Sequence, residues 1–444
     1  MSTTLAAGAE LDFSLAQQLT VIALCALTAF IAHMALAVFN DGVRPFLLDF
    51  IQGRTTRSAT TAVSFGLSAG FIFGLGAPMA LSTGVLNPWL LFLPTDILGM
   101  LSPKKWLAPI LGGAWGAVVV FGLNGANNIA HDLPVDFLTA MQQMSTPILF
   151  LFTLFPVLAI TKQFGRKWGG VAGVVEVALV VMTMKLWPNM FAGALAMAVG
   201  VLMLIGLAVS KDLRQRRADR ASGVVEEATG DDPMASLFSA SAARLRKYLP
   251  LFMLLGAGVC VLAQMHIFGG GEATSFLIAK GQYAEAAQVD FYRVFGFIPL
   301  IATTALASGA YGIAGFTLVY PIGYLMPNPF LAAVVGALVF AVEVLALSWI
   351  GKVLGKLPSV RDSSEHLRSA IGDTLQLAIL FGSLMAANAM GGGLGILVVG
   401  GLYLLNESMG RPVVRMAAAP AAVIIGGVLL NVLYWLDLFT PVKG

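Results

Sequence analysis

Apolar runs of about 20 residues recur along the whole chain and are separated by short polar turns. A helix of ~20 residues spans the hydrocarbon core of a bilayer, so this pattern predicts membrane-spanning helices. The fold class predicted is all-α: a polytopic membrane protein of about 12–14 transmembrane or re-entrant helices in two related halves. Full-length spans are predicted at residues 17–39, 59–84, 105–124, 144–162, 168–187, 190–209, 247–268, 329–350, 369–388, 390–406 and 416–438.

Two apolar segments depart from this pattern. Residues 86–101 are short, and residues 294–325 contain Pro299 and several glycines. Proline removes a backbone donor and glycine weakens a helix, so both segments are predicted to be short or interrupted. The second is expected to form two short helices that meet near Ser308–Gly309 and return to the same side of the membrane. One long span is the second choice.

Composition and charge support a membrane environment. The chain is 58% hydrophobic and 11% charged, whereas soluble domains carry roughly 25% charged residues. Lys and Arg cluster in the loops, which reports topology and predicts no nucleic-acid partner. The long hydrophilic loop 210–246 is therefore placed in the cytoplasm, and the N-terminus in the periplasm.

Short matching sequences indicate an internal repeat. Ala59–Ala62 matches Ala302–Ala305, and the Asn-Pro pair at Asn87 matches the pair at Asn328. The offsets in residue number are 243 and 241, and a weaker match near His33 has an offset of 231. The predicted domains are two transmembrane repeats and a linker, at residues 1–209, 247–444 and 210–246. Whether the repeats are inverted or parallel stays open.

Interrupted helices at membrane depth point to a solute site. Backbone groups released by a break are not satisfied by lipid, so they must be buried in protein or line a wet cavity. Hydroxyl pairs near the breaks add donors and acceptors. The predicted substrate-binding residues here are Thr60, Thr61, Thr303 and Thr304. The alternative is that small Gly, Ala and Thr side chains only allow close helix packing.

Ionisable and amide side chains within the spans are further candidates, because a charge in mid-membrane is costly. Asn40 and Asp96 are predicted to bind the solute, and Asp96 is also expected to cap a half-helix after Pro94. His33 and Asp41 are candidates for proton or ion coupling. The alternatives are that His33 only donates to a helix carbonyl, and that Asp41 belongs to a helix C-terminal turn.

Glu343 is the third coupling candidate, because it lies centrally in an apolar span, and Glu176 is its nearest rival. Neither needs to be charged, since burial favours the neutral acid. The four histidines show no metal-ligand spacing with one another or with cysteine, and no nucleotide-binding loop is present. We therefore expect no catalytic residue, no metal and no cofactor.

Several longer motifs resemble one protein family. AVFNDGVRP, LNPWLLFLPTDILG, FIPLIATTALASGAYGIAGFTLVY, NPFLAAVVGAL and NESMGRPVVRMAAAP are similar to sequences of the YhfT family of bacterial inner-membrane proteins. The likeness covers about residues 20–440. The resemblance implies a transporter in the inner membrane and hints at an amino-acid-like or phosphorylated solute. It carries over no site residues.

The favoured function is secondary active transport of a small polar, anionic solute, coupled to H⁺ or Na⁺, at a central site on interrupted helices. A phosphotransferase-type sugar permease subunit is the alternative within transport. A non-transporting membrane scaffold, or an intramembrane enzyme, is the alternative outside it. The expected partners are the lipid bilayer, the solute and the coupling ion, and a second copy in a homodimer, which is the commonest oligomer.

Overall fold

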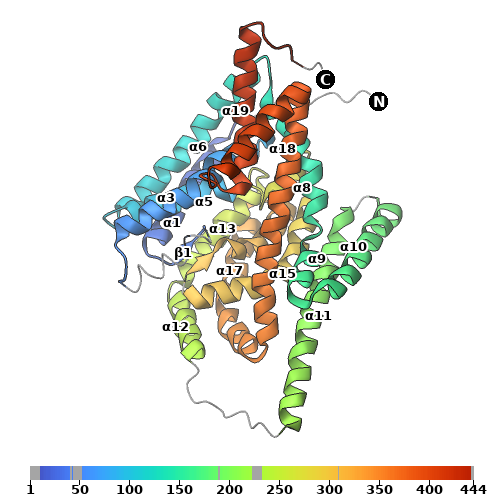
Figure 1. Cartoon of the computed structure of the whole chain (residues 1–444). Coiled ribbons are helices and arrows are strands. Elements are labelled where there is room, and N and C mark those ends of the chain that lie inside the picture. The colour runs from blue at the N-terminus through green and yellow to red at the C-terminus, as the bar shows by residue number, and fades with distance from the viewer. Residues whose placement is uncertain are drawn as a thin grey trace.

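A computed structural model (Figure 1) describes residues 11–40, 43, 53–188, 191–222, 233–308 and 310–441. In this part of the chain, eight helices are long and apolar enough to cross a membrane, or up to nine if a bent pair counts as one span. The predicted class, an all-α polytopic membrane protein, is confirmed.

Helices account for almost all regular structure in the described residues. The first part comprises α1 (Leu15–His33), β1 (Ala37–Val38), α3 (Arg57–Phe71), the π-helix η2 (Ile72–Gly76), α4 (Ala77–Thr83), α5 (Pro88–Leu101), α6 (Leu107–His131), α7 (Phe137–Met141), η3 (Gln142–Met144), α8 (Ser145–Phe152), α9 (Phe155–Phe164), α10 (Arg166–Leu186) and α11 (Ala192–Ala221).

The second part is also almost entirely helical. It comprises α12 (Pro233–Lys247), α13 (Leu249–Gln264), α14 (Glu272–Ala279), α15 (Tyr283–Ser308), β2 (Tyr311–Gly312), the 3₁₀-helix η4 (Ile313–Leu318), α16 (Val319–Leu325), α17 (Pro329–Lys356), α18 (Pro358–Ser408) and α19 (Arg415–Trp435).

Two helix groups form the centre of the molecule. Helix α1 packs along α6 and α5, and α13 packs along α17 and α16. The groups touch where α1 contacts α13. Local sequence sets the helix starts: Ser14 forms a capping box at α1, and Asn87 caps α5 with proline at its first position.

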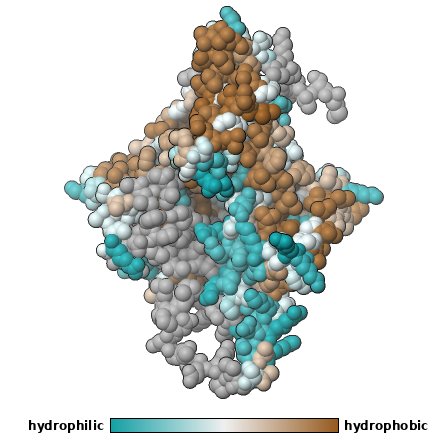
Figure 2. Space-filling model, viewed as in Figure 1, coloured by the Kyte–Doolittle hydropathy of each residue, from teal (hydrophilic) through white to brown (hydrophobic). Residues whose placement is uncertain are grey.

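The outer surface matches a membrane environment. Figure 2 shows apolar side chains over the upper part of one face and around α10, and polar side chains lower down, where α11 projects. On α10, Val174 and Val177 are exposed by 72% and 58%. A helix with such an apolar outer face is stable in lipid but not in water.

The chain folds sharply back within α18. Gly391 and Gly392 have non-helical dihedral angles, and φ of Gly392 is +53°. A Cβ on Gly395 would lie 2.0 Å from the carbonyl oxygen of Ala387, although eight residues of straight helix span about 12 Å. The bend falls just after the junction of the two predicted spans 369–388 and 390–406.

Several predicted segments differ from the structure. Helix α1 ends at His33, not at residue 39, because the chain enters a strand there. The span at 59–84 is helical but contains the π-helix Ile72–Gly76. Residues 88–101 form one continuous helix with Pro94 inside it, so this segment is short but not interrupted.

The segment 294–325 is interrupted, as its proline and glycines predict. Helix α15 ends at Ser308, strand β2 and the 3₁₀-helix η4 follow, and α16 begins at Val319. The prediction of two short helices is wrong for the first of them, because α15 already starts at Tyr283 and has 26 residues. The long single span is excluded by the same boundaries.

Candidate functional site: two cross-paired helix breaks

The two interrupted regions meet in the middle of the molecule, near the β1 label in Figure 1. Strand β1, shortly after α1, pairs in parallel with β2, shortly after α15, in the register Ala37↔Tyr311 and Val38↔Gly312. The backbone N–H of Tyr311 donates to the carbonyl of Leu36 at 2.8 Å. Backbone groups released by each break are therefore satisfied by the other break.

A second bridge joins two other segments, the one before α5 and the one after α13. The N–H of Leu86 donates to the carbonyl of Ile267 at 2.8 Å, and the N–H of Gly269 donates to the carbonyl of Leu86 at 2.9 Å. Leu86 precedes α5, and Ile267 follows α13. Each half of the chain thus contributes two extended segments, and each segment pairs with one from the other half.

Asp96 of α5 holds the break after α1. Its Oδ2 accepts hydrogen bonds from the backbone N–H of Phe39 at 2.7 Å and of Asn40 at 3.0 Å, and the side chain is fully buried. The prediction that Asp96 caps its own half-helix is wrong, because α5 is continuous through Pro94. It caps a different segment, and charge-assisted bonds of this kind are the stronger ones.

The carbonyl groups at the end of α1 are also partnered. Arg244 of α12 donates from Nη2 to the carbonyl oxygens of Met34 and Ala35, at 3.2 and 3.0 Å. Ala35 has a φ of +53°, which turns the chain out of the helix. The arginine lies far along the chain, in the segment 210–246 predicted as the linker, so no local pattern predicts this cap.

Hydroxyl groups on one face of α3 extend from this break. Asn40 donates from Nδ2 to Ser68 Oγ at 2.9 Å. Ser64 and Thr60 follow at intervals of one helical turn, and all three hydroxyl-bearing side chains are buried. Ser64 Oγ has no hydrogen-bond partner among the described residues. These side chains form a polar seam, defined here as Thr60, Ser64 and Ser68.

His33 lies at the other end of the polar seam. Its Nδ1 lies 3.0 Å from Nη1 of Arg57 and 3.1 Å from the carbonyl oxygen of Gly99. A guanidinium only donates, so Nδ1 accepts from Arg57 in a neutral ring whose proton is on Nε2. A ring with its proton on Nδ1, neutral or charged, would instead donate to Gly99, so the two contacts belong to different tautomers or protonation states. Asn40 does not share a helical face with His33, because α1 ends there.

A related arrangement holds the break after α13. The N–H of Gly270 donates to the hydroxyl of Tyr324 at 2.8 Å, and this hydroxyl donates to Oδ2 of Asp290 at 2.8 Å. Asp290 is fully buried and Tyr324 is 2% exposed. A Cβ on Gly270 would lie 2.5 Å from the Tyr320 ring, so only glycine allows this approach.

Sequence reasoning missed Asp290, Tyr324 and Gly270. Asp290 precedes the predicted segment 294–325, whereas α15 already covers it. A signal was present: DFYR, at 290–293, continues directly into the apolar segment that begins at Val294. Asp290 would have been a candidate if the predicted helix had started at Tyr283 instead of residue 294.

Aromatic rings fill the space between the two breaks. Phe92 of α5 and Phe316 of η4 lie 5.3 Å apart between ring centroids, and Phe39 packs against both, at 5.2 and 5.7 Å. Phe268, in the break after α13, also contacts Phe92, with 5.5 Å between the ring centroids. Such packing is favourable and also excludes water from the bridges.

The remaining predicted site residues lie apart or cannot be placed. Thr61 is buried and donates to the carbonyl of Arg57, one turn earlier. Asp41, and the side chains of Thr303 and Thr304 on α15, lie outside the described residues. Glu343 lies on α17, 8% exposed, and its carboxylate has no hydrogen-bond partner in the described part of the chain.

Glu176 is likewise without a hydrogen-bond partner among the described residues. It lies on α10 and packs against α11, where a Cβ on Gly200 would come within 2.2 Å of its Oε1. This acid is therefore placed among the peripheral helices α9, α10 and α11, separate from the paired breaks.

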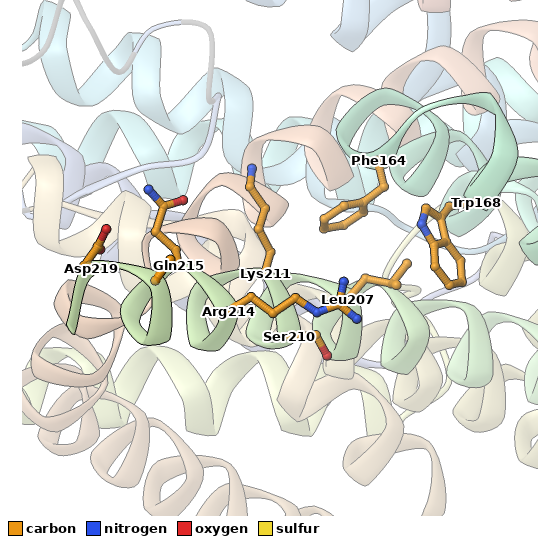
Figure 3. Close-up of a pocket in the computed structure, with 9 residues that line it drawn as sticks. Phe164, Trp168, Leu207, Ser210, Lys211, Arg214, Gln215 and Asp219 are labelled. Carbon is orange, nitrogen blue, oxygen red and sulfur yellow. The ribbon is translucent and has the colours of Figure 1, made fainter. Parts of the chain in front are cut away.

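Figure 3 shows a surface cavity of about 740 Å³ along α11. Lys211 and Arg214 of α11 line it together with Phe164 and Trp168 across the opening. The cationic and aromatic lining could hold an anionic group, and Trp is typical of a membrane–water interface. None of these residues stands out in the sequence as a site, because basic residues next to apolar spans indicate topology.

The long apolar helices define the chain as a multi-pass α-helical membrane protein. It belongs to the YhfT family, described as "Protein of unknown function", which matches residues 17–439. The relative "Uncharacterized protein YhfT" of Escherichia coli (strain K12) is 42% identical over 437 residues, covering 96% of this chain and 99% of the relative. The family resemblance seen in the motifs is confirmed. No solved structure matches the chain.

Proposed function

We propose that the protein is a secondary active transporter of a small polar, anionic solute in the bacterial inner membrane. The observation that carries the proposal is the buried Asp96 carboxylate on the backbone N–H groups of a broken helix. Broken helices that face each other between two halves of a membrane protein are typical of transporters.

The reason is energetic. A break at membrane depth releases backbone groups whose desolvation costs several kcal/mol each if they find no partner. A chain that served only as an anchor or scaffold would avoid this cost with continuous helices. Here the groups are held by hydrogen bonds that can be exchanged, between β1 and β2 and on Asp96. Exchangeable partners are what a moving site requires.

Asp96 is the proposed coupling residue. Protonation would remove its charge and weaken its bonds to Phe39 and Asn40. The polar seam and the His33–Arg57 pair offer a hydroxyl-lined route toward it along α3. The predicted roles of Thr60 and Asn40 in solute binding are consistent with this placement. We propose H⁺ as the coupling ion ahead of Na⁺, because His33 can carry a proton along the same route.

Proteoliposomes filled with a pH-sensitive dye test this function. Carboxylated and phosphorylated small solutes are added one at a time, and proton entry is recorded. At least one solute should drive proton entry, and Asp96→Asn should abolish it. Asp373→Asn is the matched control, because Asp373 is an exposed partner of Lys162 and takes no part in the hydrogen bonds at the breaks.

Three outcomes would contradict the proposal. Flux that needs a phosphorylating partner protein would indicate a phosphotransferase-type permease subunit. No flux under any gradient would indicate a scaffold. Conversion of an added solute without its movement would indicate an enzyme, which we propose the protein is not. A homodimer stays a prediction that light scattering of the purified protein can check.

A further inference from the structure

We infer that the chain is an internal duplication whose two halves exchange their extended segments, and that each half has a side-chain lock on the break after its first helix. Asp96 holds the first break, after α1, and Asp290, through Tyr324, holds the second break, after α13; each set of hydrogen bonds is called a lock here. The inference deepens the proposed function and rests on it only for the movement of the breaks. The duplication itself follows from contacts that recur at fixed offsets in residue number along the chain.

The first helices of the two halves, α1 and α13, correspond to each other at an offset of 231 in residue number. Ala35 and His266, which stand at this offset, both have positive φ, +53° and +57°, just after α1 and α13. One residue further on, the carbonyls of Leu36 and Ile267 both accept a backbone N–H from the other half, each at 2.8 Å. Positive φ is rare outside glycine, so its recurrence at equivalent points is informative.

The helices that follow correspond at a slightly smaller offset, 224, as Gly99 and Gly323 show. A Cβ on Gly99 of α5 would meet Ala29 O, Ala32 Cβ and His33 N. A Cβ on Gly323 of α16 would meet Cys260 O, Ala263 Cβ and Gln264 N, which are the same three positions at the offset of 231. Two glycines therefore pack on equivalent atoms of the first helix in each half.

Two more pairs keep these offsets. Gly112 of α6 approaches the Cys25 carbonyl, and Gly336 of α17 approaches the Gly256 carbonyl, so both members of the contact are equivalent. Phe92 and Phe316 also correspond at the offset of 224, and they contact each other. Two equivalent residues that touch must lie at the pseudo-two-fold axis relating the halves, so the axis passes between these rings.

This register corrects the sequence repeat. Ala59–Ala62 lies in the first turn of α3, whereas Ala302–Ala305 lies near the end of α15, so the tetrapeptides are not equivalent. Asn87 and Asn328 match because each caps a helix that begins with proline, at α5 and α17. Only the weak match near His33, at an offset of 231, aligns equivalent positions.

The cross-pairing follows from the same symmetry. The segment after the first helix pairs with the segment before the α5-equivalent helix of the other half, once as β1 with β2 and once as Phe268 with Leu86. The halves are thereby interlocked, and neither break has its backbone satisfied without the other half.

The two locks hold equivalent N–H groups but differ in the side chains that hold them: at the offset of 224, Asp96 corresponds to Tyr320, whereas the second acceptor is Tyr324, one turn further along α16. Phe39 and Gly270 correspond at the offset of 231, and each N–H is held by a side chain of the following equivalent helix, α5 or α16. The first acceptor is a carboxylate, and the second is a phenol backed by the Asp290 carboxylate. Because the two locks share no residue, each can open without the other.

The chain contains a reporter for each lock. Its two cysteines, Cys25 and Cys260, are both buried, and one lies in each half. Cys25 Sγ lies 4.0 Å from the Leu91 carbonyl of α5. Cys260 is covered on its backbone by Gly323 of α16 and on its Cβ by Gly336 of α17, so its thiol becomes accessible only when α13 separates from these helices. A thiol in such a place reacts only when the adjacent helix moves away.

Labelling with N-ethylmaleimide, quantified by mass spectrometry on the purified full chain, tests the inference. Asp96→Asn should raise the labelling rate of Cys25 about tenfold, as expected for a weakened charge-assisted bond, and leave Cys260 unchanged. Tyr324→Phe should raise labelling of Cys260 several-fold and leave Cys25 unchanged. Asp373→Asn should change neither rate.

Equal changes at both cysteines, or none, would overturn the independent locks. If a variant does not fold, hydrogen exchange of the unmodified protein decides. Peptides covering 34–40 and 265–271 should exchange far more slowly than the exposed turn 409–413, and fast exchange of either would refute its lock. Neither readout requires transport, so an absence of flux would refute the proposed function and leave this result standing.

Discussion

Asp96 accepts a hydrogen bond from the backbone N–H of Phe39 at 2.7 Å, across 57 residues of sequence and between two different segments. This bond fixes the end of the broken helix α1 to α5. It also places a carboxylate, fully buried, beside the parallel pair of β1 and β2. Stability and proposed coupling therefore depend on the same side chain.

Replacing Asp96 by Asn should lower the stability of the protein. The amide keeps one acceptor oxygen but loses the negative charge, and a hydrogen bond to a charged group contributes about 1.5–3 kcal/mol. The midpoint of thermal unfolding in detergent should fall. Asp96→Glu, which keeps the charge with a longer reach, should fall less. An unchanged midpoint for Asp96→Asn would show that the bond to Phe39 contributes little.

Ser64 and Ser68 should respond differently to alanine. Ser68→Ala removes the bond from Asn40 and should cost about 1 kcal/mol of unfolding free energy. Ser64→Ala removes a buried hydroxyl with no partner among the described residues, so stability should hold or rise slightly. If the polar seam carries protons, Ser64→Ala should still lower dye-reported proton entry. Full activity of Ser64→Ala would remove the seam from the route.

Gly270→Ala should destabilise the second break. Its Cβ would lie 2.5 Å from the Tyr320 ring and 2.6 Å from Asp290 Oδ2, and overpacking of this kind costs about 1–3 kcal/mol. Gly372→Ala is the matched control, because nothing lies within 4 Å of its added Cβ in α18. That substitution should stabilise the helix by about 0.5–1 kcal/mol. Thermal unfolding of both variants, side by side, measures the difference.

His33→Ala should lower proton-coupled uptake more than it lowers expression. Nδ1 accepts from Arg57 in the neutral ring, so protonation places a second cation beside the guanidinium and breaks that contact. Removing the imidazole should therefore alter the pH profile of flux. Equal losses of uptake and folded protein would assign His33 a structural role only.

Much of the fold and part of the candidate site could be predicted from sequence. Asn40, Asp96 and Thr60 stand out because polar groups are costly in an apolar span; the structure brings Asn40 and Asp96 together at one break, and Thr60 lies two turns along α3 from the Ser68 that Asn40 contacts. Their partners could not be predicted. By its local sequence Asp96 resembles a cap for its own helix, yet it binds a segment some 56 residues earlier, because caps require only a nearby N–H.

The sequence by itself determined the membrane class, the positions of most helices and the existence of the break after α15. These follow from hydrophobic length and from the local chemistry of proline and glycine, which act over a few residues. Only the tertiary structure decided that β1 pairs with β2, that Asp290 acts through Tyr324, and that the halves are related at offsets of 231 and 224. Backbone pairing and close helix approach constrain geometry far more than side-chain identity, so equivalent positions such as Phe39 and Gly270 no longer resemble each other.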